Sequence, residues 1–247
     1  MSQPILGIDI GGSGIKGNLV DLDLGEPVGQ RLKVDTPQPS TPEAVTEVLV
    51  ELVGRFDAGG PVGCTFPAVI REGVALTAAN VDPSWIGRNV AGLFEGALGR
   101  DVVVVNDADA AGLAEMSFGA ARNRGGVVIC LTFGTGIGSA LFTHGVLVPN
   151  TEFGHLNFRG YESVEDWAAA SVRDREDLSW SEWGKRVDVF LRHLEAIFSP
   201  DLIVVGGGVS RKFDRFSSEL TTSCEVVPAH LQNDAGIVGA AMAAASR

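Results

Sequence analysis

The chain has 247 residues and a formal net charge of −12, from 31 acidic and 19 basic side chains. That charge argues against nucleic acid or an anionic membrane as a partner, although backbone N–H groups and a few local cations still bind phosphate at short range. No stretch nears the ~20 apolar residues that span a bilayer, and the start MSQPILGIDIGG lacks a signal-peptide pattern. Cysteines at 64, 130 and 224 are too scattered to indicate a disulfide framework or a zinc site. We expect a cytoplasmic protein.

Apolar runs and turns alternate through the first part of the chain. Residues 4–10 predict a buried strand, and the runs near 17–22 and 28–34 predict an antiparallel arrangement beside it. Thr41 as N-cap, followed by Pro and Glu, predicts a helix. Its buried face is expected to comprise Val45, Val48, Leu49, Leu52, Val53 and Phe56. Strands near 62–66 and 101–105 and an alanine-rich helix over 108–121 are expected next.

The second part repeats this style. Residues 127–133 predict a strand that returns through 139–142, and Ser181 is expected to cap a helix with Val187, Phe190, Leu191, Leu194 and Phe198 on its apolar face. A strand at 202–205 and a small-residue helix over 236–246 follow.

A strand followed by a glycine-rich turn recurs at 5–14, 128–138 and 202–208. This recurrence predicts an α/β architecture of two lobes with a cleft between them. We expect lobes of residues 1–107 and 108–235, with the last helix, 236–247, packing back on the first lobe.

Three glycine turns after three buried strands form a candidate phosphate site. Without Cβ atoms in the way, backbone N–H groups converge into nests that favour phosphate oxygens. Taken singly, each turn is as well explained by a positive-φ requirement. None matches the P-loop, and residues 7–12 do not have the dinucleotide spacing.

Asp9 interrupts the first apolar run, between Ile8 and Ile10. A carboxylate beside a phosphate turn is suited to Mg²⁺, which binds through one or two carboxylates plus substrate phosphates. The alternative is an aspartate that only caps the turn.

Asn106-Asp107 ends the run VVVV, at the carboxyl end of a strand where ligands meet open α/β sheets. A hexose hydroxyl needs a base to accept its proton, and Asp107 is the candidate. Asp107 could instead cap the next helix, although Asp109 could take that role and leave Asp107 available. Residues 152–155, EFGH, supply a second polar cluster suited to vicinal diols.

These motifs resemble those of the ROK sugar kinases (repressor, open reading frame, kinase). The run DIGGSGIKG at 9–17 resembles that family's first phosphate motif, LTFGTGIGSALF at 131–142 the second, and LIVVGGGVS at 202–210 the third glycine-rich element. The resemblance extends from about Pro4 to Ala244. The forms GGSGIKG, SRKFDRF and PAHLQNDAGIVGAAMAA are most similar to the polyphosphate glucokinase branch.

The resemblance implies a two-lobed actin-like hexokinase (ribonuclease H-like) fold and phosphoryl transfer to the 6-hydroxyl of glucose, with mannose as a further acceptor. It implies Asp107 as the catalytic base, Mg²⁺ near Asp9 through water, and a homodimer. Sugar contacts are implied for Asn80, Asn106, Glu152, His155 and, more loosely, Glu165. Donor phosphates would be bound by Gly11, Gly12, Ser13, Gly14, Lys16, Gly134, Thr135, Gly136, Gly207, Gly208, Arg211 and Lys212.

Two of these assignments have plain structural alternatives. His155 alone would more often be an ordinary structural histidine, and Glu165 a solvated helix carboxylate. Many ROK members carry a zinc-binding CxCGxxGC stretch after the histidine, whereas residues 157–167 here read NFRGYESVEDW. We therefore expect no zinc, with the loop held by other contacts that include Trp167.

The donor is where composition and resemblance disagree. A charge of −12 favours a small donor such as ATP, whereas the resemblance favours inorganic polyphosphate and needs a local basic track. A strictly ATP-dependent hexose kinase and a non-catalytic sugar-binding regulator are the rival readings. A ROK repressor would carry a helix-turn-helix before the kinase core, and only three residues precede the first strand.

Overall fold

The computed structural model describes residues 3–246, which divide into two compact units. The first runs to Ala114 and takes in the chain again from Asp234, and the second covers Glu115–Asn233. The division falls inside helix α3 (Asp107–Phe118), whereas the sequence placed a boundary at its first residue. No helix in residues 3–246 is long and apolar enough to cross a membrane.

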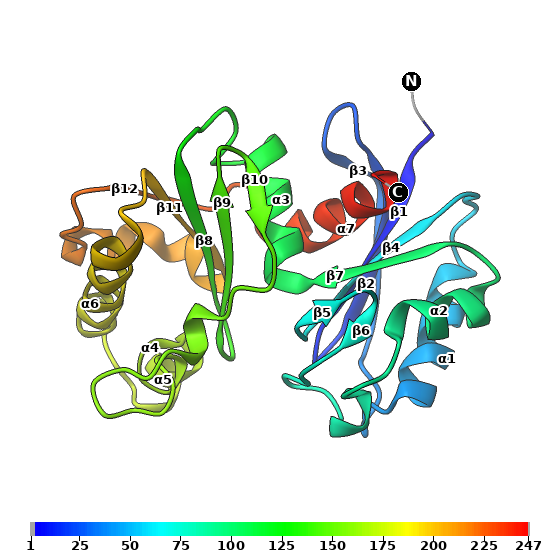
Figure 1. Cartoon of the computed structure of the whole chain (residues 1–247), viewed down its shortest axis with the longest axis horizontal. Coiled ribbons are helices and arrows are strands. Elements are labelled where there is room, and N and C mark those ends of the chain that lie inside the picture. The colour runs from blue at the N-terminus through cyan, green and yellow to red at the C-terminus, as the bar shows by residue number, and fades with distance from the viewer. Residues whose placement is uncertain (1–2, 247) are drawn as a thin grey trace. The chain divides into compact units, whose positions relative to one another are not determined.

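Each unit is built around a five-stranded mixed sheet (Figure 1). In the first unit the order is β3-β2-β1-β4-β7, with β3, β2 and β1 antiparallel and β1, β4 and β7 parallel. The strands are β1 (Ile5–Ile10), β2 (Ile15–Asp21), β3 (Glu26–Val34), β4 (Val62–Phe66) and β7 (Val102–Asn106). A short hairpin, β5 (Ile70–Arg71) and β6 (Val74–Ala75), forms a separate ladder.

The second unit repeats this topology. Its order is β10-β9-β8-β11-β12, with the same antiparallel three and parallel three. The strands are β8 (Val127–Phe133), β9 (Ile137–Thr143), β10 (Val146–Val148), β11 (Leu202–Gly207) and β12 (Glu225–Pro228). The turns β1–β2 and β8–β9 are therefore equivalent, because each joins the central strand of its sheet to the next antiparallel strand.

Helix α1 (Pro42–Val53) begins as the sequence predicts. The Thr41 side chain accepts a hydrogen bond from the N–H of Ala44 at 3.3 Å, and Pro42 occupies the first turn. Of the predicted buried face, Val48 and Phe56 are only partly buried, and the other four residues are fully in the core. Helix α2 (Val90–Leu98) completes this side of the unit and packs against β7.

Helix α7 (Ala235–Ala245) packs on β1 and β4, so the last helix covers part of the first unit's sheet (Figure 1). Gly7 and Gly63 pair across β1 and β4. A Cβ on Gly7 would lie 2.0 Å from the Ile237 oxygen, and a Cβ on Gly63 would lie 1.8 Å from the Ala240 oxygen. Glycine is needed at both positions because the helix backbone lies directly on the sheet backbone. The small side chains of α7 follow from the same contact.

The second unit's helices are α4 (Glu165–Ala168), α5 (Ala170–Arg175) and α6 (Trp180–Phe198). The α6 N-cap is Ser179, which forms a reciprocal capping box with Glu182. The prediction that Ser181 caps this helix is wrong, because the Ser181 hydroxyl donates to Glu219 at 2.7 Å instead. Four of the five predicted apolar residues of α6 are fully buried, and Phe198 is partly buried.

Candidate active site

The first glycine turn, residues 11–14, is closed by a hydrogen bond from the Gly11 N–H to the Gly14 oxygen at 3.0 Å. The Thr36 hydroxyl donates to the Gly11 oxygen at 2.5 Å. A Cβ on Gly12 would lie 2.7 Å from the Asn80 oxygen, so the turn lies against the segment that carries Asn80. Ser13 at its tip is exposed.

Asp9 is fixed at the edge of this turn by both of its carboxylate oxygens. Oδ1 accepts from the hydroxyl of Thr65 at 2.9 Å, and Oδ2 accepts from the Lys16 ammonium at 3.2 Å. Thr65 is fully buried in β4, and its Oγ1 also accepts from the N–H of Ile10 at 3.1 Å. Thr65 is a site residue that the sequence did not indicate, because it is 56 positions from Asp9 and looks like an ordinary strand threonine.

Asn106 and Asp107 follow the end of β7. The Asn106 amide oxygen accepts from the N–H groups of Ala108 and Asp109 at 2.9 and 3.0 Å, and its NH₂ donates to the Ala68 oxygen at 3.0 Å. Asn106 thus caps α3, whereas the sequence offered Asp109, or Asp107 as the alternative to its role as base, for that cap. The Asp107 side chain is exposed, and its Oδ1 also accepts from the N–H of Ala108 at 2.9 Å.

The second glycine turn, residues 134–136, is held by the α4–α5 segment. The Gly134 N–H donates to the Gly136 oxygen at 2.9 Å. The Glu165 Oε2 accepts from the N–H of Ile137 at 3.0 Å, and a Cβ on Gly136 would lie 2.3 Å from that oxygen. Glu165 is therefore not a solvated helix carboxylate. One of its carboxylate oxygens lies against the turn.

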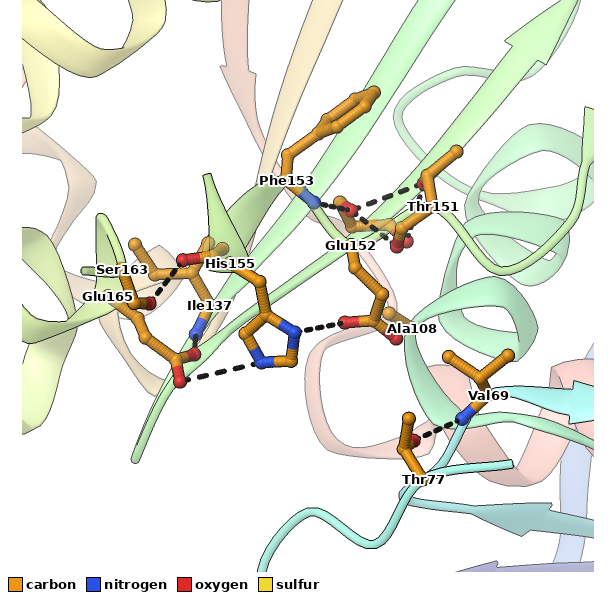
Figure 2. A network of polar contacts seen from close by, with 12 residues as sticks. Val69, Thr77, Ala108, Ile137, Thr151, Glu152, Phe153, His155, Ser163 and Glu165 are labelled. Carbon is orange, nitrogen blue, oxygen red and sulfur yellow. Dashed lines mark hydrogen bonds and ion pairs between the residues drawn. The ribbon is translucent and has the colours of Figure 1, made fainter. Parts of the chain in front are cut away.

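Glu152 comes from a segment that Ser139 of β9 anchors. The buried Ser139 hydroxyl donates to the Thr151 oxygen at 2.7 Å and accepts from the N–H of Phe153 at 2.9 Å. These bonds grip the backbone on both sides of Glu152, and a short 3₁₀ turn, Phe153–His155, then brings His155 next to it (Figure 2).

Glu152, His155 and Glu165 form a row of polar side chains that point toward one another (Figure 2). The Glu152 Oε2 lies 3.7 Å from His155 Nδ1, and the Glu165 Oε1 lies 3.6 Å from His155 Nε2. Both distances exceed hydrogen-bond length, so this row keeps donors and acceptors available for a ligand's hydroxyl groups. His155 is half exposed.

The environment of Glu152 changes its titration. Burial raises the pKa of the Glu152 carboxyl above its usual range, and the nearby Glu165 carboxylate raises the pKa further. His155 acts in the opposite direction and lowers this pKa. A carboxyl of this kind changes charge at a higher pH than an exposed glutamate.

The third glycine turn follows β11. Gly207 has φ +79° and lies against the backbone of Phe133, whereas Gly208 borders open space. Arg211 and Lys212 come next and are exposed. The Arg211 Nε donates to the Gln232 Oε1 at 2.8 Å, which fixes one edge of the guanidinium group.

Within residues 3–246 no three His, Cys, Asp or Glu side chains gather as a ready set of metal ligands. Asp9 offers a carboxylate, one-fifth exposed, beside the first glycine turn. A cation that binds one carboxylate, water and donor phosphates fits that arrangement.

Comparison with known proteins places these residues in a family. The ROK family model matches residues 5–166, about two thirds of the chain. The chain belongs to the ROK family. Polyphosphate glucokinase from Mycobacterium tuberculosis (strain H37Rv) is 53% identical over 96% of this chain and 89% of its own length, and that of Mycobacterium leprae is 52% identical, with 73% of its length covered.

Solved ROK structures match the fold. The inorganic polyphosphate/ATP-glucomannokinase from Arthrobacter sp. strain KM has a TM-score of 0.95 at 47% identity, with 99% of both chains covered. A ROK family glucokinase from Streptomyces griseus, in complex with glucose and AMPPNP, has a TM-score of 0.84 at 24% identity over 99% of this chain and 100% of its own. The expectation of the two-lobed actin-like hexokinase fold is confirmed.

The predicted ROK site residues divide between the two units. The first unit holds Asp9, the first turn with Lys16, Asn80, Asn106 and Asp107. The second holds the 134–136 and 207–208 turns, Glu152, His155, Glu165, Arg211 and Lys212. The roles of these residues remain predictions.

Proposed function

We propose that this chain is a kinase that transfers a phosphoryl group from inorganic polyphosphate, and also from ATP, to the 6-hydroxyl of glucose. The observation that carries the proposal is the 53% identity to mycobacterial polyphosphate glucokinases over 96% of the chain. The likeness to the Arthrobacter glucomannokinase supports mannose as a further acceptor.

We assign the hexose ring to the row Glu152, His155 and Glu165, together with Asn80. Their carboxylate, imidazole and amide groups each satisfy sugar hydroxyls, and the second unit's three are not saturated by one another. Asn106 stays a proposed sugar contact. Its amide also holds the start of α3, and so the backbone of Asp107.

We assign the base to Asp107. It accepts the proton of the 6-hydroxyl as the oxygen attacks the terminal phosphorus of the donor, and the bond from that phosphorus to the bridging oxygen breaks in line. The glycine turns bind the donor phosphates through backbone N–H groups, with Lys16, Arg211 and Lys212 as nearby cations. Positioning and electrostatics supply most of the catalysis in such transfers.

A divalent cation, which we take to be Mg²⁺, fits beside Asp9 together with the donor phosphates. When bound, it would offset phosphate charge. The chain's own contribution is to hold Asp9 through Thr65 and Lys16. The family resemblance also supports a cytoplasmic homodimer, which sedimentation of the purified protein would test.

One experiment tests the function directly. Purified protein is assayed for glucose 6-phosphate formation with polyphosphate and with ATP, side by side, at matched Mg²⁺. We expect turnover with both, and polyphosphate activity at least equal to ATP activity. Turnover with ATP alone would leave a strictly ATP-dependent hexose kinase, and no turnover with either, but measurable glucose binding, would favour a non-catalytic sugar-binding protein.

A further inference from the structure

Glu165 contacts the second glycine turn and the row of proposed sugar ligands at the same time. Its Oε2 accepts from the N–H of Ile137 at 3.0 Å, at the end of the turn. Its Oε1 lies 3.6 Å from His155 Nε2. Figure 2 shows this carboxylate between Ile137 and His155. One rigid group thus touches both the phosphate turn and the hexose site.

The contact with the turn is tight. The oxygen that accepts from Ile137 lies where a Cβ on Gly136 would stand, at 2.3 Å, so only glycine leaves room for the carboxylate. The Gly134 N–H bonds back to the Gly136 oxygen at 2.9 Å. The Glu165 carboxylate therefore packs directly on the turn and is bonded to its last N–H group.

A second residue holds the same turn from the same segment but has no link to the row. The Ser171 N–H donates to the Gly134 oxygen at 3.0 Å, and its hydroxyl donates to the Thr135 oxygen at 2.7 Å. Glu165 and Ser171 lie six positions apart, on α4 and α5. Variants of Glu165 and Ser171 can therefore be compared to separate support of the turn from contact with the row.

We infer that Glu165 is a positioning residue that couples hexose binding to donor binding, and that Ser171 supports the turn without coupling the two. The inference rests on the proposed function, since it takes the turn as a donor site and the row as a hexose site. Sugar hydroxyls that donate to Glu165 Oε1 fix the carboxylate. The fixed carboxylate then holds the Ile137 N–H and the turn in one conformation, which lowers the cost of ordering the turn around a phosphate.

Coupling of this kind is reciprocal, because each ligand changes the affinity of the other by the same factor. Typical coupling between two sites is about 5- to 150-fold. The negative charge of Glu165 beside a phosphate turn works against donor binding while the sugar is absent. Neutralising the charge therefore affects donor affinity in the free enzyme, whereas the coupling factor reports the mechanical link.

The test measures the dissociation constant of inorganic tripolyphosphate by calorimetry, with and without saturating 6-deoxyglucose, which lacks the hydroxyl that accepts phosphate. In the unaltered protein we expect the sugar to tighten tripolyphosphate binding about 5-fold or more. In Glu165→Ala, which removes both the bond to Ile137 and the group beside His155, we expect the ratio to fall to about 1–2, whatever happens to the absolute affinity. Ser171→Ala should weaken tripolyphosphate binding but keep the ratio.

Asp166→Asn is the matched control, since Asp166 is the exposed neighbour of Glu165 in the first turn of α4. Asp166→Asn should change the dissociation constant of tripolyphosphate neither with nor without the sugar. Gly136→Ala provides a second test that keeps the Glu165 charge. Because the added Cβ displaces the carboxylate from the turn, this variant should also lower the ratio to about 1–2.

The inference is overturned if Glu165→Ala keeps the full ratio, or if Ser171→Ala loses it to the same extent. Failure of the proposed function looks different, because the unaltered protein would then show no glucose phosphorylation with any donor. A melting temperature for each variant separates loss of coupling from loss of folding.

Discussion

Asp107 stands at the first position of α3, where a carboxylate is expected both as a base and as a cap. The cap depends mainly on Asn106, whose amide oxygen accepts from the N–H groups of Ala108 and Asp109, while Asp107 Oδ1 shares only the Ala108 N–H. Removing the Asp107 charge therefore leaves the helix start in place. A loss of activity in such a variant can be read as a loss of chemistry.

We expect Asp107→Asn to lower kcat by the roughly 10²–10⁴-fold typical of a general base, while the dissociation constant of glucose changes far less. Steady-state kinetics and calorimetry give the two numbers. Asp101→Asn, at the exposed residue just before β7, is the control and should behave like the unaltered protein. Near-normal kcat in Asp107→Asn would remove this residue from the mechanism.

Glu152 should make glucose affinity fall measurably at acidic pH, which we call the acid limb of the binding profile. Its pKa is raised by burial and by Glu165, and only the ionised carboxylate accepts from sugar hydroxyls. Glucose affinity should therefore fall as the pH drops through this raised pKa, at a higher pH than an ordinary glutamate would require. Calorimetric titration of glucose at a series of pH values measures the limb.

The Glu152→Gln variant tests the assignment of that limb. It should bind glucose more weakly at neutral pH and with little pH dependence, while the tripolyphosphate affinity without sugar is unchanged. The Glu152 carboxyl should also make the stability of the protein depend on pH. Because its folded pKa is raised, the folded state holds the extra proton, and the free energy of unfolding falls as the pH rises through that pKa. An identical acid limb in Glu152→Gln would place the titrating group elsewhere.

At the scale of elements, the contact between α7 and the first sheet is the most exacting. A Cβ on Gly63 would lie 1.8 Å from the Ala240 oxygen, so helix and strand would have to separate. We expect Gly63→Ala to cost about 1–3 kcal/mol of the free energy of unfolding, as overpacking does. Urea denaturation measures the change.

Gly59→Ala is the control for that substitution. Gly59 is exposed, three residues before β4 begins, and nothing lies within 4 Å of an added Cβ. It should change the free energy of unfolding by no more than about 0.5 kcal/mol in either direction. Equal stability of the two variants would mean that α7 does not rest on β4 as described.

The elements themselves were largely predictable. Apolar runs and capping residues locate β1, α1, β4, β8 and β11, because local propensity and burial agree there. The error at Ser181 could have been avoided, because Ser179 and Glu182 have the S-x-x-E spacing of a capping box, whereas Gly184 stands three residues after Ser181.

The site was predictable only in part. Glycine turns and the residues of Asn106-Asp107 and EFGH can be recognised along the chain. The contacts of Thr65 with Asp9, and of Glu165 with the 136–137 backbone, join residues 28 or more positions apart. Such contacts depend on strand register and on the repeated sheet order, and neither leaves a local pattern.

At the scale of the whole molecule, the donor question opposes net charge to local charge. With a net charge of −12, binding of a long polyanion depends on a small set of cations. Arg211 is the best prepared of these, because its Nε bond to Gln232 orients the group and leaves the terminal nitrogens for phosphate oxygens.

We expect Arg211→Ala with Lys212→Ala to raise the KM for polyphosphate more than the KM for glucose, and to reduce the salt dependence of the former. Arg55→Ala with Arg192→Ala is the control of equal charge, since both arginines are exposed and each pairs with an acidic residue four positions earlier. Initial rates at several salt concentrations measure both. A similar rise of the polyphosphate KM in the control pair would make net charge, not a local track, the cause.

The position of α7 also sets an order of events during synthesis. The ribosome delivers β1 first and α7 last, yet the close contacts of β1 and β4 with Ile237 and Ala240 need both ends of the chain. The second unit is continuous in sequence from Glu115 to Asn233, so all of its strands are available before α7 is made. The part of the chain that is made first is therefore completed last, and a nascent chain stalled before residue 235 would expose the glycine-lined face of its first sheet to chaperones.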